Sequence, residues 1–429
     1  MTKSEAEDFV YKSYLKAAKY QEYNQKDSEK RHPELTKKMI REKARTPCTV
    51  VTGSKGKGSV ANMISQILQT KYKVGLMTSP HISDFCERFK INGKNISDEA
   101  FIKYISLIQP EIEKIDSEIP ENICISPMGI QTLLGLEYFN AENTDFNIFE
   151  CGKGAKFDDV NNLLHQYAII NSIFLEHTRE LGGTLEAIAE DKAHVITGEQ
   201  KCVFTAEETE SVLAILQKRA EEYKVPLKIY GRDFSAKNIR FTNQGMCFDV
   251  DIGGQIYTDI VIPLLGIHQA KNCALAMAFC KEVLGDFDLD LVKKKLAEID
   301  WPGRMEIISK DPLIILDACI NSASCKNIKE SLKFMNIDKI TCIIGIPDDK
   351  DYAGVIREMN SLSNNIILTK SNNPHYMFTE EQCKKMAEEG IETIWTNSVE
   401  EAIEKAKNDL LPVVILGTTS VISDVKLFY

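Results

Sequence analysis

The residues best suited to chemistry lie at positions 52–59, which read Thr-Gly-Ser-Lys-Gly-Lys-Gly-Ser. The short apolar run 49–51 precedes them, and apolar residues at helical spacing follow, at Val60, Met63, Ile64, Ile67 and Leu68. A glycine-rich loop between a strand and a helix lets backbone N–H groups converge on an anion at the positive end of the helix. The segment therefore predicts a phosphate-binding loop, made of Gly53, Ser54, Lys55, Gly56, Lys57, Gly58 and Ser59. In it, Lys57 supplies a positive charge and Ser59 a hydroxyl that can ligate magnesium.

The spacing within this loop departs from the common Gly-x-x-x-x-Gly-Lys-Ser/Thr motif. Val51 stands where that motif has its first glycine, and Gly58 separates Lys57 from Ser59. The variant Thr-Gly-x-x-Gly-Lys-Gly-Ser resembles the loop of the folylpolyglutamate and dihydrofolate synthases, which belong to the Mur ligase superfamily. The alternative is a glycine-rich turn with a solvated lysine.

A second polar stretch, residues 78–93, follows the expected strand 72–77. Its Thr-Ser-Pro-His-Ile and Glu-Arg-Phe-Lys-Ile-Asn-Gly parts resemble the synthase loop that borders the nucleotide and pteridine-type substrate sites. A serine at a strand end beside a phosphate loop, here Ser79, is suited to magnesium, and His81 and Arg88 could hold a carboxylate or phosphate. An ordinary polar connection is the alternative, although loops of this length tend to be functional.

Two further metal ligands are predicted at strand ends. The strand 146–149 leads into Glu150, and ligand groups of an open α/β sheet lie at the carboxyl ends of its strands. Residues 150–161 resemble the synthase segment whose glutamate binds magnesium. The Leu-Glu-His-Thr-Arg-Glu-Leu-Gly stretch after the expected strand 168–174 resembles Leu-Asp-His-Thr-x-x-Leu-Gly, and this implies that His177 ligates a second metal. Taken alone, a histidine after a strand is more often structural.

The resemblance continues through two helices. The helix that carries Lys192 matches the synthase helix whose lysine is carbamylated, a change that turns a cation into an anionic oxygen ligand for magnesium. A plain surface lysine is the alternative. Residues 263–276 match the segment Leu-Gly-x-His-Gln-x-x-Asn-Ala, which implies that Asn272 contacts the nucleotide.

The sequence Trp-Pro-Gly-Arg-Met-Glu at 301–306 matches the start of the carboxy-terminal domain of the synthases. The match implies that Arg304 contacts phosphate across the domains, and the forked guanidinium suits that role. Asp317 keeps the acidic residue of the Asp-Gly-Ala-His-Asn-Pro motif, which implies a contact with the ribose of the nucleotide. Ile320 replaces the histidine of that motif, which contacts nucleotide phosphates in the family. Isoleucine can neither donate a hydrogen bond nor carry charge.

Composition limits the possible functions. The 429 residues are 43% hydrophobic and 27% charged, with a formal net charge of −11, which argues against a nucleic-acid groove. Twelve cysteines occur without a Cys-x-x-Cys pair, as expected for reduced thiols. No apolar run approaches the roughly 20 residues of a membrane span, and the polar first residues show no targeting peptide. We therefore expect a cytoplasmic protein, with a monomer favoured and with neither membrane nor nucleic acid as a partner.

The length predicts two or three domains, and the resemblance implies how the chain is divided. Residues 1–46 form a charged helical segment, 47–300 a P-loop NTPase-like Mur ligase central domain with a parallel sheet, and 301–429 a Rossmann-like domain of alternating strands and helices. Between residues 201 and 262 we expect short strands with turns, forming antiparallel elements attached to the central domain.

The combined reading is an ATP-dependent ligase. Two magnesium ions, held by Ser59, Ser79, Glu150, His177 and carbamylated Lys192, would assist phosphoryl transfer together with Lys57 and Arg304. Resemblance implies glutamate as the amine and a folate as the carboxylate substrate. Two alternatives stay open: a ligase that joins an amino acid to a non-folate carboxylate in a specialised pathway, and a nucleotide-binding partner subunit without turnover.

Overall fold

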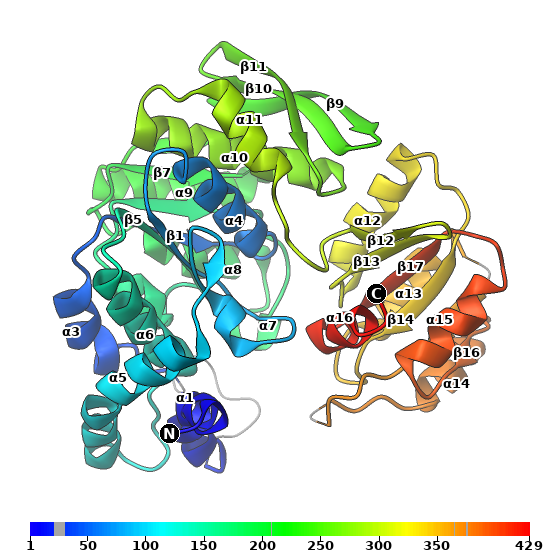
Figure 1. Ribbon diagram of the computed structural model, residues 1–429, viewed down its shortest axis with the longest axis horizontal. Coiled ribbons are helices and arrows are strands. Elements are labelled where there is room, and N and C mark those ends of the chain that lie inside the picture. The colour runs from blue at the N-terminus through cyan, green and yellow to red at the C-terminus, as the bar shows by residue number, and fades with distance from the viewer. Residues whose placement is uncertain (21–30, 207, 364, 375) are drawn as a thin grey trace. The chain divides into compact units, whose positions relative to one another are not determined.

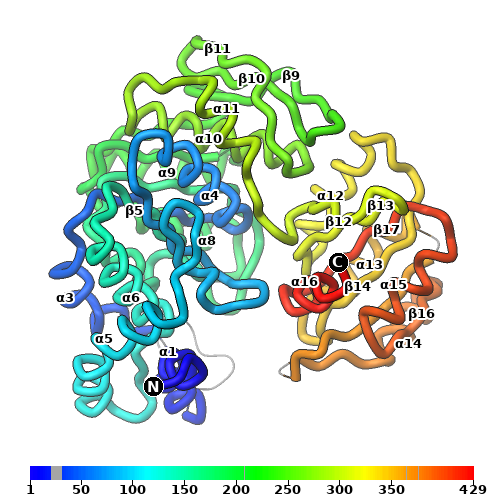
Figure 2. Tube along the Cα trace, viewed as in Figure 1, coloured from blue at the N-terminus to red at the C-terminus, as the bar shows by residue number. Residues whose placement is uncertain are grey.

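The computed structural model describes residues 1–20, 31–206, 208–363, 365–374 and 376–429. These residues form two compact units. Figure 1 labels many of their elements, and Figure 2 traces the course of the chain. The first unit contains residues 1–237, 250–257 and 271–296, and the second contains 238–249, 258–270 and 297–429. Of the segment 1–46 that was predicted to be helical, residues 21–30 lie outside the described residues.

The first unit is built on an eight-stranded sheet with the order β4-β3-β2-β5-β1-β6-β7-β8. Its strands are β1 Cys48–Thr52, β2 Val74–Met77, β3 Phe89–Ile91, β4 Lys94–Asn95, β5 Phe146–Glu150, β6 Tyr167–Ile170, β7 Cys202–Thr205 and β8 Leu227–Ile229. The strands from β2 to β8 in this order pair in parallel, whereas β3 and β4 add an antiparallel edge. This confirms the predicted parallel sheet.

Helices and short 3-10 turns connect these strands. They are α1 Lys3–Ala18, α3 Glu34–Lys43, α4 Lys57–Leu68, η1 Phe85–Arg88, α5 Asp98–Glu118, α6 Pro127–Ala141, η2 Asp159–Asn162, α7 Thr178–Leu181, α8 Leu185–Lys192, η3 Ala193–Val195, α9 Glu210–Tyr223, α10 Ile267–Leu284 and α11 Leu289–Ala297. The apolar stripe of α4 is fully buried, as its spacing predicts.

The expectation for residues 201–262 was partly wrong. The segment contains α9, whose Val212, Leu216 and Ala220 recur every four residues and are buried, besides the parallel strands β7 and β8. The remaining part forms a three-stranded sheet in the order β11-β10-β9, from β9 Phe234–Thr242, β10 Gly245–Ile252 and β11 Gln255–Ile262. Consecutive strands in it are joined by two residues, and so short a connection requires antiparallel neighbours, as predicted.

The second unit carries a six-stranded sheet with the order β12-β13-β17-β14-β15-β16. Its strands are β12 Glu306–Lys310, β13 Leu313–Asp317, β14 Thr341–Gly345, β15 Asn365–Leu368, β16 Ile394–Trp395 and β17 Val413–Gly417. Its helices are α12 Ser322–Phe334, α13 Tyr352–Met359, α14 Glu381–Glu388, α15 Val399–Lys407 and α16 Thr419–Lys426. All pairs are parallel except β12 with β13, so the predicted Rossmann-like alternation is confirmed and β12 adds an unforeseen edge.

Each unit has its own hydrophobic core. The core of the first unit includes apolar side chains of β1, β5 and β6 together with those of α5 and α6, and that of the second unit packs α12 and α13 against the β13–β14 region. Within the described ranges, no helix is both long and apolar enough to cross a bilayer.

Candidate active site

Four neighbouring strands of the first unit place the predicted site residues at one edge of the sheet. Val51 of β1 is paired with Glu150 of β5, and Met77 of β2 is paired with Phe149. Thr52 is paired with Ile170 of β6. Because these strands are parallel, Gly53, Ser79, Glu150 and Asn171 all lie at or just beyond their carboxyl ends. This edge is where an open α/β sheet binds its ligands.

The phosphate loop leads directly into α4. Gly56 is the residue before the helix and has a φ of 75°, which glycine adopts without a steric cost. Lys57 opens the helix, and its Nζ donates a hydrogen bond to the carbonyl oxygen of Gly53 over 3.1 Å. Ser59, in the first turn, is 2% exposed, and its Oγ has no hydrogen-bond partner among the described residues. A buried, unsatisfied oxygen at this place fits the predicted magnesium ligand.

Lys192 is fully buried at the end of α8. Its Nζ donates to the carbonyl oxygen of Gly53 over 2.9 Å and lies 3.0 Å from Oε1 of Glu176. Burial lowers the pKa of this amine, Glu176 opposes the shift, and the nearby charge of Lys57 adds to it. Glu176 stands where the resembling family has aspartate, and it forms a partly buried ion pair with Lys192. A structural role for Lys192, as the ammonium of this ion pair, is therefore the alternative to its carbamylation.

Glu150 and His177 are positioned by different contacts. Glu150 is 4% exposed, and its Oε2 accepts a hydrogen bond from the backbone N–H of Ser79 over 3.0 Å, so these two predicted ligands are in contact. His177 has left-handed backbone angles directly before α7, and its half-exposed ring lies 4.0 Å from Oε2 of Glu176. Glu176 therefore lies between His177 and Lys192.

The two predicted substrate residues contact each other. Nε of Arg88 donates to Nδ1 of His81 over 2.9 Å, and Nη1 of Arg88 donates to Oε1 of Gln131 over 2.7 Å. Arg88 is 8% exposed and lies over the ring of Phe85. Burial and then the charge of Arg88 lower the pKa of His81 to about 4. His81 is therefore neutral at pH 7, with its proton on Nε2.

Asn171, which contacts the phosphate loop, was not predicted from the sequence. Its Nδ2 donates to the carbonyl oxygen of Lys55 over 2.9 Å and to Oδ1 of Asn272 over 3.1 Å. Asn272, the predicted nucleotide ligand, is thereby located beside the loop. The only signal available in the sequence was a polar residue at the end of an apolar strand.

The remaining predicted site residues lie in the second unit. Oδ2 of Asp317, which is buried, accepts from the backbone N–H of Met305, and Arg304 donates to the carbonyl oxygen of Gly303. The carboxylate of Asp317 thus fixes the backbone next to Arg304. Ile320, at the position of the family histidine, packs against the hydrophobic core of this unit. The side chain at this position therefore contributes to packing.

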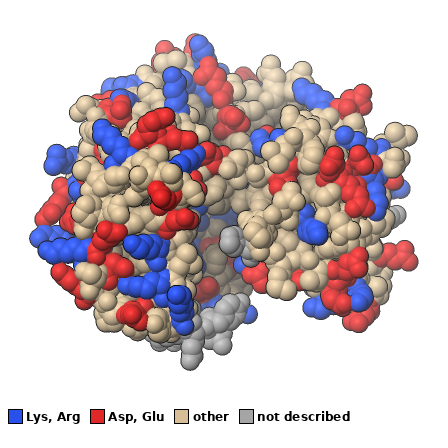
Figure 3. All heavy atoms as spheres, turned by 60° about the horizontal axis from the view of Figure 1, so that its bottom comes forward, with Lys and Arg blue, Asp and Glu red and all other residues tan. Residues whose placement is uncertain are grey.

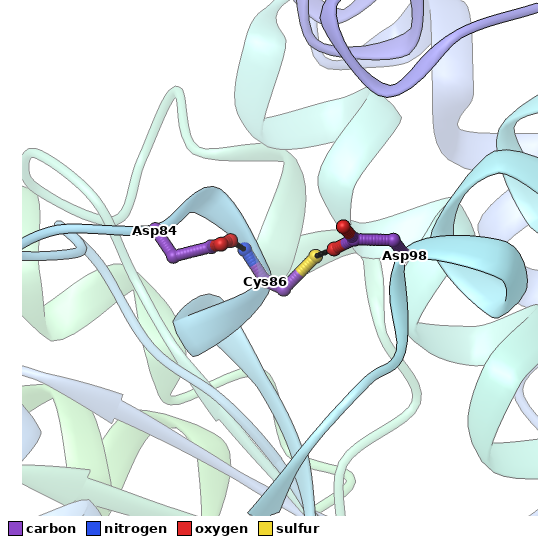
Figure 4. A group of neighbouring side chains, drawn as sticks. All are labelled: Asp84, Cys86 and Asp98. Carbon is purple, nitrogen blue, oxygen red and sulfur yellow. Dashed lines mark hydrogen bonds between the residues drawn. The ribbon is translucent and has the colours of Figure 1, made fainter.

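Among the described residues, Asp84, Cys86 and Asp98 form another group whose oxygen and sulfur atoms lie close enough together to hold a metal ion (Figure 4). The ammonium of Lys3 lies 2.5 Å from a carboxylate oxygen of Asp84 and 2.7 Å from one of Asp98. The ammonium of Lys3 supplies the positive charge that a metal ion would otherwise bring. These ion pairs therefore connect α1 to residues 84–98. On the face drawn in Figure 3, positive and negative side chains are mixed.

Two sequence families match the chain. The family described as "Mur ligase middle domain" matches residues 51–280, and "Mur ligase, glutamate ligase domain" matches residues 303–418. A folylpolyglutamate synthase from Lacticaseibacillus casei is 28% identical over 383 residues, which cover 88% of each chain. A probable bifunctional folylpolyglutamate synthase/dihydropteroate synthase from Halobacterium salinarum is 31% identical over 306 residues. That match covers 71% of this chain but only 37% of the relative.

A solved structure supports the fold. The folylpolyglutamate synthase of Mycobacterium tuberculosis, complexed with ADP and AMPPCP, superposes with a TM-score of 0.85 and 23% identity. The superposition covers 92% of this chain and 93% of the other. At this identity the likeness establishes the arrangement of elements.

Proposed function

Because the chain belongs to the Mur ligase family, we propose that it is an ATP-dependent ligase that couples a carboxylate to the amino group of an amino acid. The observation that carries the proposal is the convergence of the phosphate loop, Ser79 and Glu150 at the carboxyl edge of the sheet. Relatives that match most of the chain are named for adding glutamate to folates, so a folate and glutamate are the proposed substrates.

The reaction proceeds in two steps. A carboxylate oxygen of the acceptor attacks the γ-phosphorus of ATP, and the bond from that phosphorus to ADP breaks, which leaves an acyl phosphate. The amine then attacks the acyl carbon, loses a proton and expels inorganic phosphate. Lys57 offsets the negative charge that develops on the phosphoryl oxygens, which a fixed charge at a buried site does effectively.

Magnesium is the metal implied for this chemistry, and the residues present fit it. Ser59, Ser79, Glu150, His177 and a carbamylated Lys192 are the proposed ligands, and the ions would neutralise phosphate charge when bound. The unsatisfied Oγ of Ser59 and the contact between Glu150 and Ser79 support this assignment. Burial favours the neutral amine of Lys192, which is the form that reacts with carbon dioxide, losing a proton as the carbamate forms.

His81 and Arg88 are the proposed contacts of the acceptor, with Nε2–H of His81 as the hydrogen-bond donor. Arg304 and Asp317 are assigned to nucleotide binding. Exclusion of water from the acyl phosphate is a requirement of this chemistry, because hydrolysis would waste ATP.

The test is release of inorganic phosphate from ATP in the presence of magnesium, with a panel of folates and amino acids. Dihydropteroate or tetrahydrofolate together with glutamate should give amine-dependent release, and Glu150→Gln should lower that rate at least about 100-fold while ATP still binds. Unchanged turnover in Glu150→Gln would exclude the proposed role of this carboxylate.

A second candidate is a ligase for a non-folate carboxylate, and the packing of Ile320 against the core, in place of the family histidine, favours it. In that case the folate pairs stay silent while another pair of carboxylate and amine releases phosphate. A nucleotide-binding subunit without turnover would bind ATP but release no phosphate in response to any amine.

A further inference from the structure

The segment 171–174, which follows β6, runs alongside the phosphate loop. The backbone N–H of Ser54 donates to the carbonyl oxygen of Ser172, and Oγ of Ser54 both donates to the carbonyl oxygen and accepts from the N–H of Phe174. At the start of the segment, the N–H of Asn171 donates to the carbonyl oxygen of Thr52. The conformation of the loop is therefore set by a strand end that lies more than a hundred residues away in the sequence.

The side chain of Asn171 makes the most specific of these contacts. It is 2% exposed, and its NH2 group is shared between the carbonyl oxygen of Lys55 and Oδ1 of Asn272. Its own Oδ1 is buried without a hydrogen-bond partner among the described residues. Buried side-chain oxygens are rarely left without a partner, so this one calls for an explanation.

Both asparagine amides pack against Gly56, the last residue before α4. A β-carbon at position 56 would lie 2.6 Å from Nδ2 of Asn171 and 3.1 Å from Nδ2 of Asn272. The two amides thus lie against one side of the loop, at the point where its backbone enters α4. A shift of either amide would therefore change the position of the backbone N–H groups of the loop.

We propose that Asn171 is a positioning residue for nucleotide binding: its NH2 group holds the phosphate loop at the carbonyl of Lys55 and orients the amide of Asn272. The inference rests on the proposed function, because it assigns the loop to ATP. The backbone contacts between β1 and β6 do not involve this side chain. Loss of the NH2 group therefore disturbs the loop more than the sheet.

The experiment measures the dissociation constant of ATP with magnesium by calorimetry, on the full chain and without acceptor or amine. Asn171→Ala removes the NH2 group that donates to the carbonyl oxygen of Lys55 and to Oδ1 of Asn272, and it should weaken ATP binding about 10- to 100-fold. Asn171→Asp keeps the size of the side chain but presents an oxygen where the donor was, so it should bind ATP no better than Asn171→Ala.

Asn162→Ala is the matched control. Asn162 is a buried asparagine of the same unit, and its Nδ2 also donates to a backbone carbonyl, that of Pro33, over 2.7 Å. It should lose thermal stability to a similar degree but keep the ATP affinity of the unchanged chain. Ser54→Ala, which removes two other contacts between loop and segment, is a second variant and should weaken ATP binding several-fold.

The outcomes separate this inference from the proposed function. If the unchanged chain binds ATP while Asn171→Ala binds it equally well, or loses no more affinity than Asn162→Ala, the inference is overturned and the function stands. ATP affinity near that of the unchanged chain in Asn171→Asp also overturns it, because the donor is then unnecessary. If the unchanged chain binds no ATP, the proposed function fails and the inference fails with it.

Discussion

The amines of Lys57 and Lys192 donate to the same carbonyl oxygen, that of Gly53. Two positive charges around one oxygen repel each other, and the repulsion contributes to the lowered pKa of Lys192. Glu176 offsets part of that repulsion through its ion pair with Lys192. A phosphate bound at the loop would offset more of it, so the local charge of the loop favours an anionic ligand.

A substitution at Gly56 tests whether the backbone conformation of the phosphate loop is needed for ATP binding. Gly56→Ala forces a left-handed angle on a residue with a side chain and pushes its β-carbon against Asn171. We expect ATP affinity to fall at least about 10-fold and the free energy of unfolding to fall by roughly 2 kcal/mol. Calorimetry and urea unfolding measure the two effects.

Gly285→Ala is the control for that substitution. Gly285 has nearly the same backbone angle, a φ of 74°, but a β-carbon there would meet open space among the described residues. It should cost about 1 kcal/mol of stability and leave ATP affinity unchanged. Equal losses of affinity in both variants would mean that backbone strain, and not the asparagine contacts, matters at Gly56.

Residue types revealed the chemistry but not the contacts. Lys57, Glu150 and Ser79 were predictable because a glycine-rich loop and polar residues follow apolar strands, and parallel strands align their carboxyl ends. Asn171 was not, since its partner Lys55 lies 116 positions earlier and only the pairing of β6 with β1 brings them together.

At the scale of elements, α8 matters because it carries Lys192 at its last position. Thr184 is the N-cap residue of this short helix, and its Oγ1 accepts from the N–H of Ala187 over 3.2 Å. Thr184→Ala removes that cap, so we expect a loss of about 1 kcal/mol in the free energy of unfolding. Thr184→Ser should retain most of the stability, and a loss in it as large as in Thr184→Ala would rule out capping as the cause. Urea unfolding measures both.

Helices and strands with one clear hydrophobic periodicity could be predicted from the sequence. Element ends, helices between closely spaced strands, and edge strands could not. The strand expected at 168–174 ends at Ile170, because the following residues turn to contact the phosphate loop. Helix α9 was overlooked although Val212 and Leu216 are spaced for a helix, since the strands that flank it dominate the pattern. The edge strand β12 depends on pairing with β13, which no local signal shows.

At the scale of the whole molecule, Asp159 links stability to pH. Its carboxylate is fully buried and accepts from Thr36 and Ser126, yet burial raises its pKa to about 6. A raised pKa means that the contribution of this group is complete below the unfolded-state pKa near 4 and is lost as pH rises through 6. We therefore expect Asp159 to destabilise the fold at pH 7.5 by up to about 3 kcal/mol relative to pH 4.

Asp159→Asn should remove that dependence. Urea unfolding of both proteins between pH 4.5 and 7.5 gives the difference in the free energy of unfolding, in which the other titrating groups cancel. The variant should gain stability relative to the unchanged chain as pH rises. A difference that is constant over this range would show that Asp159 keeps an ordinary pKa in the fold.

The predicted division at residue 300 can be tested by separating the chain there. The phosphate loop, Glu150 and Asn171 lie in the first unit, and Arg304 and Asp317 lie in the second. A fragment of residues 1–300 keeps these three groups, so it should still bind ATP with magnesium, about 5- to 150-fold more weakly than the full chain if one phosphate contact of about 1–3 kcal/mol is lost. It should show no amine-dependent phosphate release. Full-length Arg304→Ala should lose most of its turnover as well, whereas turnover by the fragment alone would mean that residues 301–429 supply no group needed for the reaction.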